Sequence, residues 1–204
     1  MAGTGRVERA ADIAHATFVV EASRETAAEA RGVAAEAVSA VLAALAQAGV
    51  PADDLRTAGL DVQPTWDHDG NRPVRTGFTV ANRIAVAVRD LERVGTVVDA
   101  ALRSGANGLD GLRFELGDPA ADMTEARRLA VFDARQRATT IAEAAGRSLG
   151  PLVAIAEGGA PVPLARREAR LMSMAADAPP TPVIPGSVEI SVTVTAEWEL
   201  AERD

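Results

Sequence analysis

The chain has 204 residues, of which 48% are hydrophobic and only 3% aromatic, and its formal net charge at neutral pH is −8. Nucleic acids require a basic surface, so an acidic chain of this kind is not expected to bind them. The sequence contains no cysteine and no lysine. Disulfides, thiolate or Schiff-base chemistry and zinc sites held by thiolates are therefore excluded.

The core has to be built from small aliphatic side chains, which bury little area in each contact. Self-association would bury further apolar surface and so add to the stability of such a chain. The longest apolar run, residues 37–50, is too short to span a bilayer. Residues 1–16 lack the apolar stretch of a signal peptide. The chain as given is therefore expected to be a soluble cytoplasmic protein, and an exported one if a leader has been removed.

The first elements in chain order are a strand and a helix. Residues 11–23 alternate between apolar and polar side chains, as expected for a half-buried strand. Thr26 and Glu29 then form a capping box, which marks the start of a helix. Apolar residues recur at helical spacing up to Gly49, which is predicted to end the helix in a left-handed conformation.

Two alternating segments, residues 55–66 and 74–89, predict the arms of a β-hairpin. The segment between them contains an Asp-Gly pair, which is the strongest local signal for a hairpin turn. Leu60, Val62 and Trp66 are expected on one face of the first arm.

The hairpin turn also raises a catalytic alternative, because Asp67, His68 and Asp69 are consecutive. These residues could serve a metal-dependent hydrolase or a small-molecule binding module. His15, the other histidine, lies on a different predicted strand, so the turn interpretation is favoured over a metal site. No catalytic, cofactor-binding or metal-binding residue is predicted.

A second strand–helix–strand unit follows the hairpin and weakly repeats the first. Its helix begins at Asp90 and ends at Gly105, and a short strand over residues 109–116 comes next. A long helix then runs from Asp118 to Gly146. It carries alanine at every fourth position, at Ala126, Ala130, Ala134, Ala138 and Ala142.

These patterns together predict an α+β fold. We expect a mixed, largely antiparallel sheet with helices packed on one face, containing the two weakly repeated strand–helix–strand units. Residues 1–204 are interpreted as one domain.

Residues 158–186 form a Pro-rich arm before the last strand, which covers residues 187–200. A connection of this length is usually functional. The arm contains a predicted short helix over residues 164–176 and too many apolar residues to be a disordered linker. The apolar residues of the arm are predicted to form an oligomer interface, with packing over the chain's own sheet as the alternative. They are Leu164, Leu171, Met172, Met174, Val183 and Ile184.

Several stretches carry a resemblance to a known family through their order and spacing. They are "GTGRVERAADIAHATFVVEASRETAAEA", "AGVPADDLRTAGLDVQPTW", "GFTVANRIAVAVRDLERVGTVVDAALRSGAN", "DGLRFELGDPAADMTEARRLAVFDARQRATTIAEAAGRSLG", "VAIAEGG" and "VEISVTVTAEWEL". From Gly3 to Leu200 the chain resembles the SIMPL domain family, which includes bacterial periplasmic immunogenic proteins. It departs from the family at Ala11–Asp12, where Pro-Asp is usual.

The resemblance implies an α+β fold, large ring- or channel-like homo-oligomers, and loose links to stress defence or to signalling by protein association. It supplies no catalytic residues. The sequence therefore predicts a non-enzymatic SIMPL-domain protein that assembles with copies of itself and associates with other proteins, without cofactors or nucleic acid.

Overall fold

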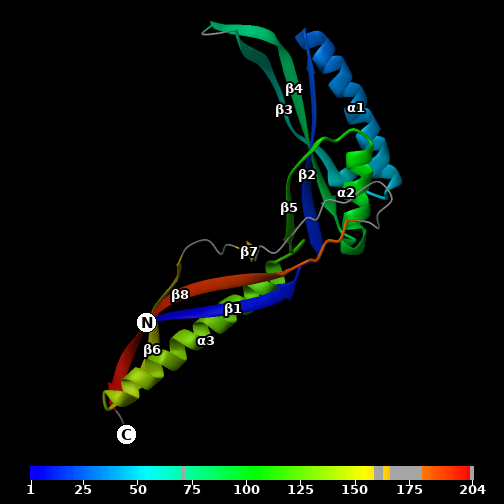
Figure 1. Cartoon of the computed structure of the whole chain (residues 1–204). Coiled ribbons are helices and arrows are strands. Elements are labelled where there is room, and N and C mark those ends of the chain that lie inside the picture. The colour runs from blue at the N-terminus through cyan, green and yellow to red at the C-terminus, as the bar shows by residue number, and fades with distance from the viewer. Residues whose placement is uncertain (70–71, 159–162, 166–180, 203–204) are drawn as a thin grey trace. The chain divides into compact units, whose positions relative to one another are not determined.

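In a computed structural model, the chain folds into α-helices and antiparallel strands (Figure 1). The described residues are 1–69, 72–158, 163–165 and 181–202. They divide into two compact units. The terminal unit consists of residues 1–11, 115–167 and 186–204, and the central unit consists of residues 12–114 and 168–185.

The terminal unit is one long helix packed on a sheet. Strand β8 (Ser187–Glu202) is the middle strand and pairs antiparallel with both β1 (Ala2–Ala10) and β6 (Arg147–Gly158). The short strand β7 (Pro163–Ala165) also pairs with β8. Helix α3 (Ala120–Ala144) covers one face of this sheet.

Small residues bring α3 unusually close to β1. The alanines that recur along the helix are all buried, and they face the sheet together with Val7, Ile190, Val192 and Val194. A Cβ atom added at Gly5 would lie 1.9 Å from the carbonyl oxygen of Ala126, and one at Gly3 would lie 2.3 Å from that of Ala130. These two positions therefore require glycine because the helix backbone occupies the space of a side chain.

The central unit holds a four-stranded sheet in the order β3-β4-β2-β5. Its strands are β2 (Ile13–Arg24), β3 (Leu55–Asp69), β4 (Arg72–Val88) and β5 (Gly108–Glu115). Helix α1 (Ala27–Gln47) follows β2, and α2 (Val94–Arg103) follows β4. This order of strands and helices is the split β-α-β arrangement, formed from two strand–helix–strand units.

The core of the central unit lies between its sheet and α1 and α2. Phe18, Val20, Val41 and Leu45 are its largest fully buried side chains together with valines of β4 and α2. Helix α1 begins at the predicted capping box, in which the Thr26 side chain accepts from Glu29 N–H at 3.3 Å. In β2 and β4, the buried face follows the alternation in the sequence, whereas the edge strand β3 has no buried residue among positions 55–67.

Two connections complete the central unit: η1 (Ala52–Asp54) leads from α1 into β3, and η2 (Leu91–Arg93) leads from β4 into α2. Asp90 caps η2 by accepting from Glu92 N–H at 3.2 Å. Both connections are single turns of 3-10 helix, which is the usual use of that helix.

The fold class predicted from the sequence is confirmed, including antiparallel strands with helices on one face and the two strand–helix–strand units. The predicted left-handed glycines are also confirmed, since Gly49, Gly105 and Gly146 have φ values of 85°, 121° and 72°. The pattern did not reveal strand β1 or the division of the strands into two sheets. The single domain over 1–204 stays a prediction.

Candidate functional site

The segment that suggested a metal or acid–base site is the end of the β3–β4 hairpin. Asp69 is the last residue of β3 and pairs with Arg72, the first residue of β4. The hairpin is therefore confirmed, while residues 70–71 lie outside the described residues. Asp67 is exposed.

The structure does not bring the two histidines together. His15 pairs with Ala87 near one end of β4, and His68 pairs with Pro73 near the other end. At about 3.3 Å per residue, the stretch of β4 between these two partners spans roughly 45 Å. His15 is half-buried and faces the side of the sheet that has no helix. A site containing both histidines is excluded within one chain.

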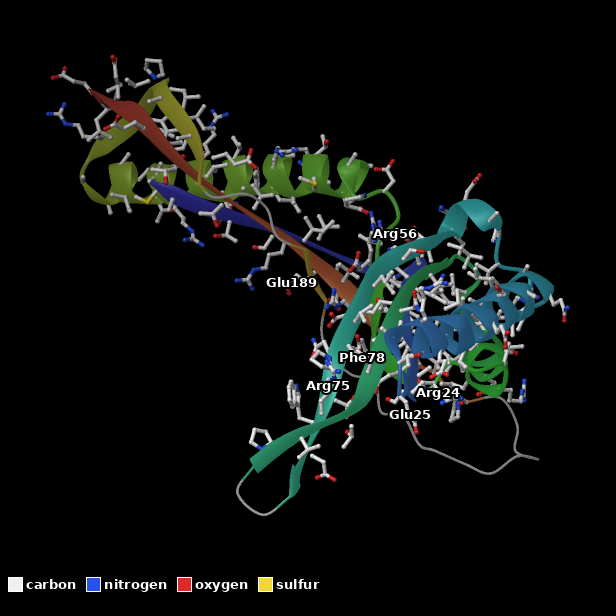
Figure 2. The ribbon with its side chains drawn as sticks, turned by 90° about the horizontal axis from the view of Figure 1, so that it is seen from above. Arg24, Glu25, Arg56, Arg75, Phe78 and Glu189 are labelled. Atoms are coloured by element: carbon white, nitrogen blue, oxygen red, sulfur yellow. The ribbon has the colours of Figure 1, made fainter. Side chains whose placement is uncertain are left out.

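The hairpin extends beyond the rest of its sheet. The last residue of β2, Arg24, pairs with Phe78, so the part of β4 before Phe78 has only β3 as a neighbour among the described strands (Figure 1). Arg75 lies over the ring of Phe78, with its guanidinium carbon 5.1 Å from the ring centre (Figure 2). This cation–π contact covers the ring at the base of the extension.

The face of the central sheet that lacks helices holds a polar hollow of about 510 Å³. Asp61, Ala81 and Glu21 lie side by side on three neighbouring strands and form part of its lining. The Thr79 hydroxyl is hydrogen-bonded to those of Ser23 and Thr65, at 2.7 and 3.0 Å. The described lining of the hollow contains the carboxylates of Glu21 and Asp61 but no histidine or lysine.

Asp54 has a structural role that the sequence interpretation missed. The Asp54 carboxylate is almost buried and accepts two hydrogen bonds from Arg89, at 3.0 and 2.8 Å. This bidentate pair joins the η1 connection to the end of β4. The hydrogen bonds and charge of Asp54 raise the pKa of Arg89 above its ordinary value.

Arg93 holds the end of α1 in the same region. Its guanidinium donates to the carbonyl oxygen of Ala48 at 2.6 Å, which satisfies a group that the helix end leaves unpaired. The same side chain fills the space beside Gly49. The hollow beside Gly49 measures about 150 Å³ and is lined by Arg89 and Arg93. Arg89 already binds Asp54, and Arg93 binds the Ala48 carbonyl oxygen, so neither guanidinium is free to bind a ligand.

Asp133 links the helix and β1 in the terminal unit. Its carboxylate accepts from the backbone N–H of Thr4 at 2.8 Å and from Arg137 at 3.0 Å. The hydrogen bond from Thr4 is the main reason why the pKa of Asp133 is lowered, and Arg137 adds to it. The carboxylate therefore anchors the edge strand of this sheet to α3.

The Pro-rich arm is attached to its own chain at both described ends. Leu164 lies in β7, where its backbone is paired opposite Glu189 of β8, so the predicted helix does not begin there. Thr181 contacts α2, with its hydroxyl donating to Asp99 at 2.7 Å and its backbone N–H to the same carboxylate at 3.3 Å. Gly95 leaves room for the Thr181 carbonyl, which is 2.3 Å from the position of an added Cβ.

The predicted interface residues have different positions. Leu171, Met172 and Met174 lie outside the described residues. Val183 is half-buried, whereas Ile184 is 78% exposed. Among the described members, Ile184 therefore presents the clearest apolar surface.

Further exposed apolar side chains lie on the strands at the sheet edges. In the central unit, edge strand β3 exposes Leu60 and Val62. In the terminal unit, edge strand β6 exposes Leu152, Val153 and Ile155. The alternation predicted for Leu60 and Val62 is present, but their face is not buried within this chain. Exposed edge strands of this kind can pair with another chain.

Comparison with known proteins identifies the family. The family model SIMPL, described as a protein of unknown function, matches residues 1–198. This chain belongs to the SIMPL family. Among the described residues, no helix is long and apolar enough to cross a membrane.

Two relatives illustrate what the SIMPL chain is similar to. The 26 kDa periplasmic immunogenic protein of Brucella abortus (strain S19) is 34% identical over 206 residues, covering 97% of this chain and 82% of the relative. The uncharacterized protein YggE of Escherichia coli (strain K12) is 27% identical over 153 residues, covering 75% of this chain and 62% of YggE. Neither name describes an enzyme.

The expectation of a cytoplasmic location is wrong. It rested on the absence of an apolar leader in residues 1–16, but the Brucella melitensis relative, 33% identical, is also named a periplasmic protein. A leader is cleaved from an exported protein, so the residues of the folded domain carry no record of it.

Proposed function

We propose that this SIMPL-family protein is a non-enzymatic module that assembles with copies of itself. The observation that supports this most directly is the exposure of apolar side chains along two edge strands, β3 and β6. A long edge strand with apolar side chains is a template for pairing with another chain. Contiguous exposed apolar side chains are uncommon on the surface of natural proteins and favour an interface.

The composition of the protein points in the same direction. The terminal unit buries mostly alanine and valine under a single helix, and such contacts remove little area from water. Self-association would add burial that one chain does not supply. The ring- or channel-like assemblies implied by the family are consistent with this need.

We propose that the arm takes part in this assembly. Its two described ends contact their own chain, since β7 pairs with β8 and Thr181 binds Asp99, so the proposed contacts with a neighbour are assigned to the apolar residues between them. Leu171, Met172 and Met174 are these residues and remain the proposed contacts. Ile184, just beyond the Thr181 contact, adds an exposed apolar side chain to them.

The proposed assembly acts outside the cytoplasm. The support is the periplasmic description of the Brucella relatives, of which one is 34% identical over 97% of this chain. A role in envelope function or stress defence would follow from that location.

Light scattering of the purified full chain at micromolar concentration tests the proposal. An oligomer is expected for the natural sequence. A variant in which residues 166–180 are replaced by a short Gly/Ser bridge keeps β7 and Thr181, and it should form a smaller but folded species. The matched control, Asp99→Ala, loosens the arm without removing its apolar residues. A monomer for the natural sequence would contradict the proposal.

The non-enzymatic part of the proposal is tested by metal analysis. The separation of His15 from His68 supports it, because one histidine and loop carboxylates make a poor site for a transition metal. No stoichiometric metal is expected in protein purified from medium containing zinc and manganese. Stoichiometric zinc or manganese that is lost in His68→Ala would instead favour the metal-dependent hydrolase.

A further inference from the structure

The polar hollow of the central sheet has a small residue as its floor and a carboxylate on each side. Ala81 of β4 pairs with both Glu21 of β2 and Asp61 of β3. Val80, the residue before Ala81, is buried in the cluster with α1, so Ala81 points to the face without helices. The volume of about 510 Å³ lies within the range of roughly 300–1,000 Å³ that is usual for small-molecule sites.

The lining offers both acceptors and donors of hydrogen bonds. The ionised carboxylates of Glu21 and Asp61 can only accept. The Gln63 amide donates to Asp61 at 2.7 Å and carries a second N–H. Arg83 donates through Nε to Asp110 at 3.0 Å, which orients its guanidinium and the further N–H groups on it. A ligand that uses this lining fully therefore has to donate as well as accept.

Trp66 adds a flat apolar surface to the hollow. The chain has only two tryptophans, and Trp198 packs against the core of the terminal unit, whereas Trp66 is 56% exposed. Neighbouring residues of a regular strand face opposite sides, yet Thr65 and Trp66 both line the hollow. The register of β3 with β4 shifts between these two residues. Such bulges redirect side chains and are frequent beside functional sites, which accounts for the position of Trp66.

We propose that this hollow binds a neutral saccharide. The face of a pyranose ring that carries C–H groups would stack on the indole of Trp66, because an aromatic ring offers a flat apolar surface. The hydroxyl groups at the edge of the sugar ring would donate to Glu21 and Asp61 and accept from Gln63. Each sugar hydroxyl can do both, which matches the mixed lining. This site is independent of the proposed self-assembly.

An organic cation is the competing ligand, since an indole and two carboxylates also attract positive charge. An ammonium group carries only donors, however, so it leaves the N–H groups of Gln63 and Arg83 unused. An anionic ligand would meet the charges of Glu21 and Asp61. A neutral ligand with several hydroxyl groups uses the donors and the acceptors together and is therefore favoured.

Tryptophan fluorescence of the full chain tests the proposal. In Trp198→Phe, Trp66 is the only tryptophan, so its emission reports on the hollow. The probes are maltose, cellobiose, lactose and N,N′-diacetylchitobiose. At least one of them is expected to change the emission saturably, with a dissociation constant of about 0.1–10 mM.

Saturation-transfer NMR then compares variants with the sugar that binds, and it does not require a tryptophan. Trp66→Ala and Asp61→Asn are each expected to raise the dissociation constant at least about tenfold. Both side chains lie at the surface, so circular dichroism should show an unchanged fold. The matched control is Asp53→Asn, which removes an exposed carboxylate of η1 that is not part of the described lining and should leave the affinity unchanged.

Three results would overturn the proposal. The first is the absence of a saturable response to all four disaccharides. The second is binding that Trp66→Ala and Asp61→Asn leave unchanged, because the sugar would then occupy another place. The third is spermidine that binds more tightly than every sugar and is lost in Asp61→Asn, which would assign the hollow to a cation.

Discussion

The two units of this chain achieve burial in opposite ways. In the central unit, Phe18, Leu45 and a set of valines fill the space between a sheet and two helices. In the terminal unit, α3 presents a row of alanines to β1, and Gly3 and Gly5 let the two backbones approach closely. Packing in the central unit depends on large side chains that fill space. Packing between α3 and β1 in the terminal unit depends on small residues that let the backbones come close.

This difference determines which substitutions each unit tolerates. Removing methylene groups from a volume-filled core leaves a cavity, and its cost grows with the size of that cavity. Adding a methyl group between two backbones in contact forces them apart, since neither has a side chain that can rotate away. The central unit should therefore be sensitive to deletions, and the terminal unit to additions.

The largest effect is expected for Phe18→Ala in the central unit. Phe18 is fully buried, and truncation of a buried phenylalanine typically lowers the free energy of unfolding by about 3–5 kcal/mol. Urea unfolding followed by circular dichroism measures this loss. Phe132→Ala on α3 is the matched control, because Phe132 is exposed and should change stability by less than about 0.5 kcal/mol. Similar losses for both variants would mean that Phe18 does not hold the core.

Gly5→Ala in the terminal unit should come next. The new methyl group would lie 1.9 Å from Ala126 O and 2.5 Å from Ala130 N, so α3 and β1 must separate. Overpacking of this kind costs about 1–3 kcal/mol, and we expect the upper part of this range because the obstacle is backbone. Gly111→Ala, where nothing lies within 4 Å, should be far milder in the same urea titration. Equal losses at the two glycines would refute close packing as the cause.

The glycine and alanine contacts also show where sequence reasoning reached its limit. The spacing of Ala126, Ala130 and Ala134 indicated a flat face on a helix, but not its partner. That partner is β1, whose buried positions include Gly3 and Gly5. Glycine carries no side chain, so these positions contribute nothing to an alternation of apolar and polar residues. The strand was therefore missed, and with it the second sheet.

Local signals were more informative in the central unit. The capping box at Thr26 and the glycine after each helix report on backbone conformation within a few residues, and all of them were confirmed. The ion pair of Asp54 with Arg89 joins residues 35 positions apart, which no local pattern reveals. The alternation in the sequence placed Leu60 and Val62 on the same face of a strand. It could not show that this face is exposed, because that depends on which strands α1 covers.

Gly146→Val tests conformational strain without any packing change. Gly146 has φ of 72°, and no atom lies within 4 Å of an added Cβ. A β-branched residue resists this conformation, and a loss of roughly 1 kcal/mol or more is expected. Gly105→Val in the central unit combines the same strain with a contact to Ala37 at 3.3 Å, so it should lose more. Thermal unfolding measures both losses of stability. A larger loss for Gly105→Val than for Gly146→Val would show that the contact with Ala37 adds to the backbone strain.

Asp133→Asn should produce a smaller loss that depends on pH. Because the Thr4 N–H lowers the pKa of Asp133 in the folded protein, its stabilising effect is present above the unfolded pKa of about 3.9. The effect is lost as pH falls through the lower folded value. The difference in melting temperature between the natural protein and Asp133→Asn should therefore be constant from pH 7 to 5 and should shrink toward pH 2. A difference that grows on acidification would contradict this assignment.

The smallest effect is expected for His68→Ala at the end of the β3–β4 hairpin. If this segment only connects two strands, the free energy of unfolding should change by no more than about 0.5 kcal/mol, as at surface positions generally. The pairing of Asp69 with Arg72 supports that interpretation, because the two residues of sequence between them, Gly70 and Asn71, are of the kind that favours a tight hairpin connection. A loss above about 2 kcal/mol would mean that His68 is buried or ligated. The titration is repeated at protein concentrations above and below the one at which the chains assemble. A loss of stability found only in the assembled protein would place the hairpin end in an interface between copies. A loss in the monomer would instead favour the metal-site interpretation.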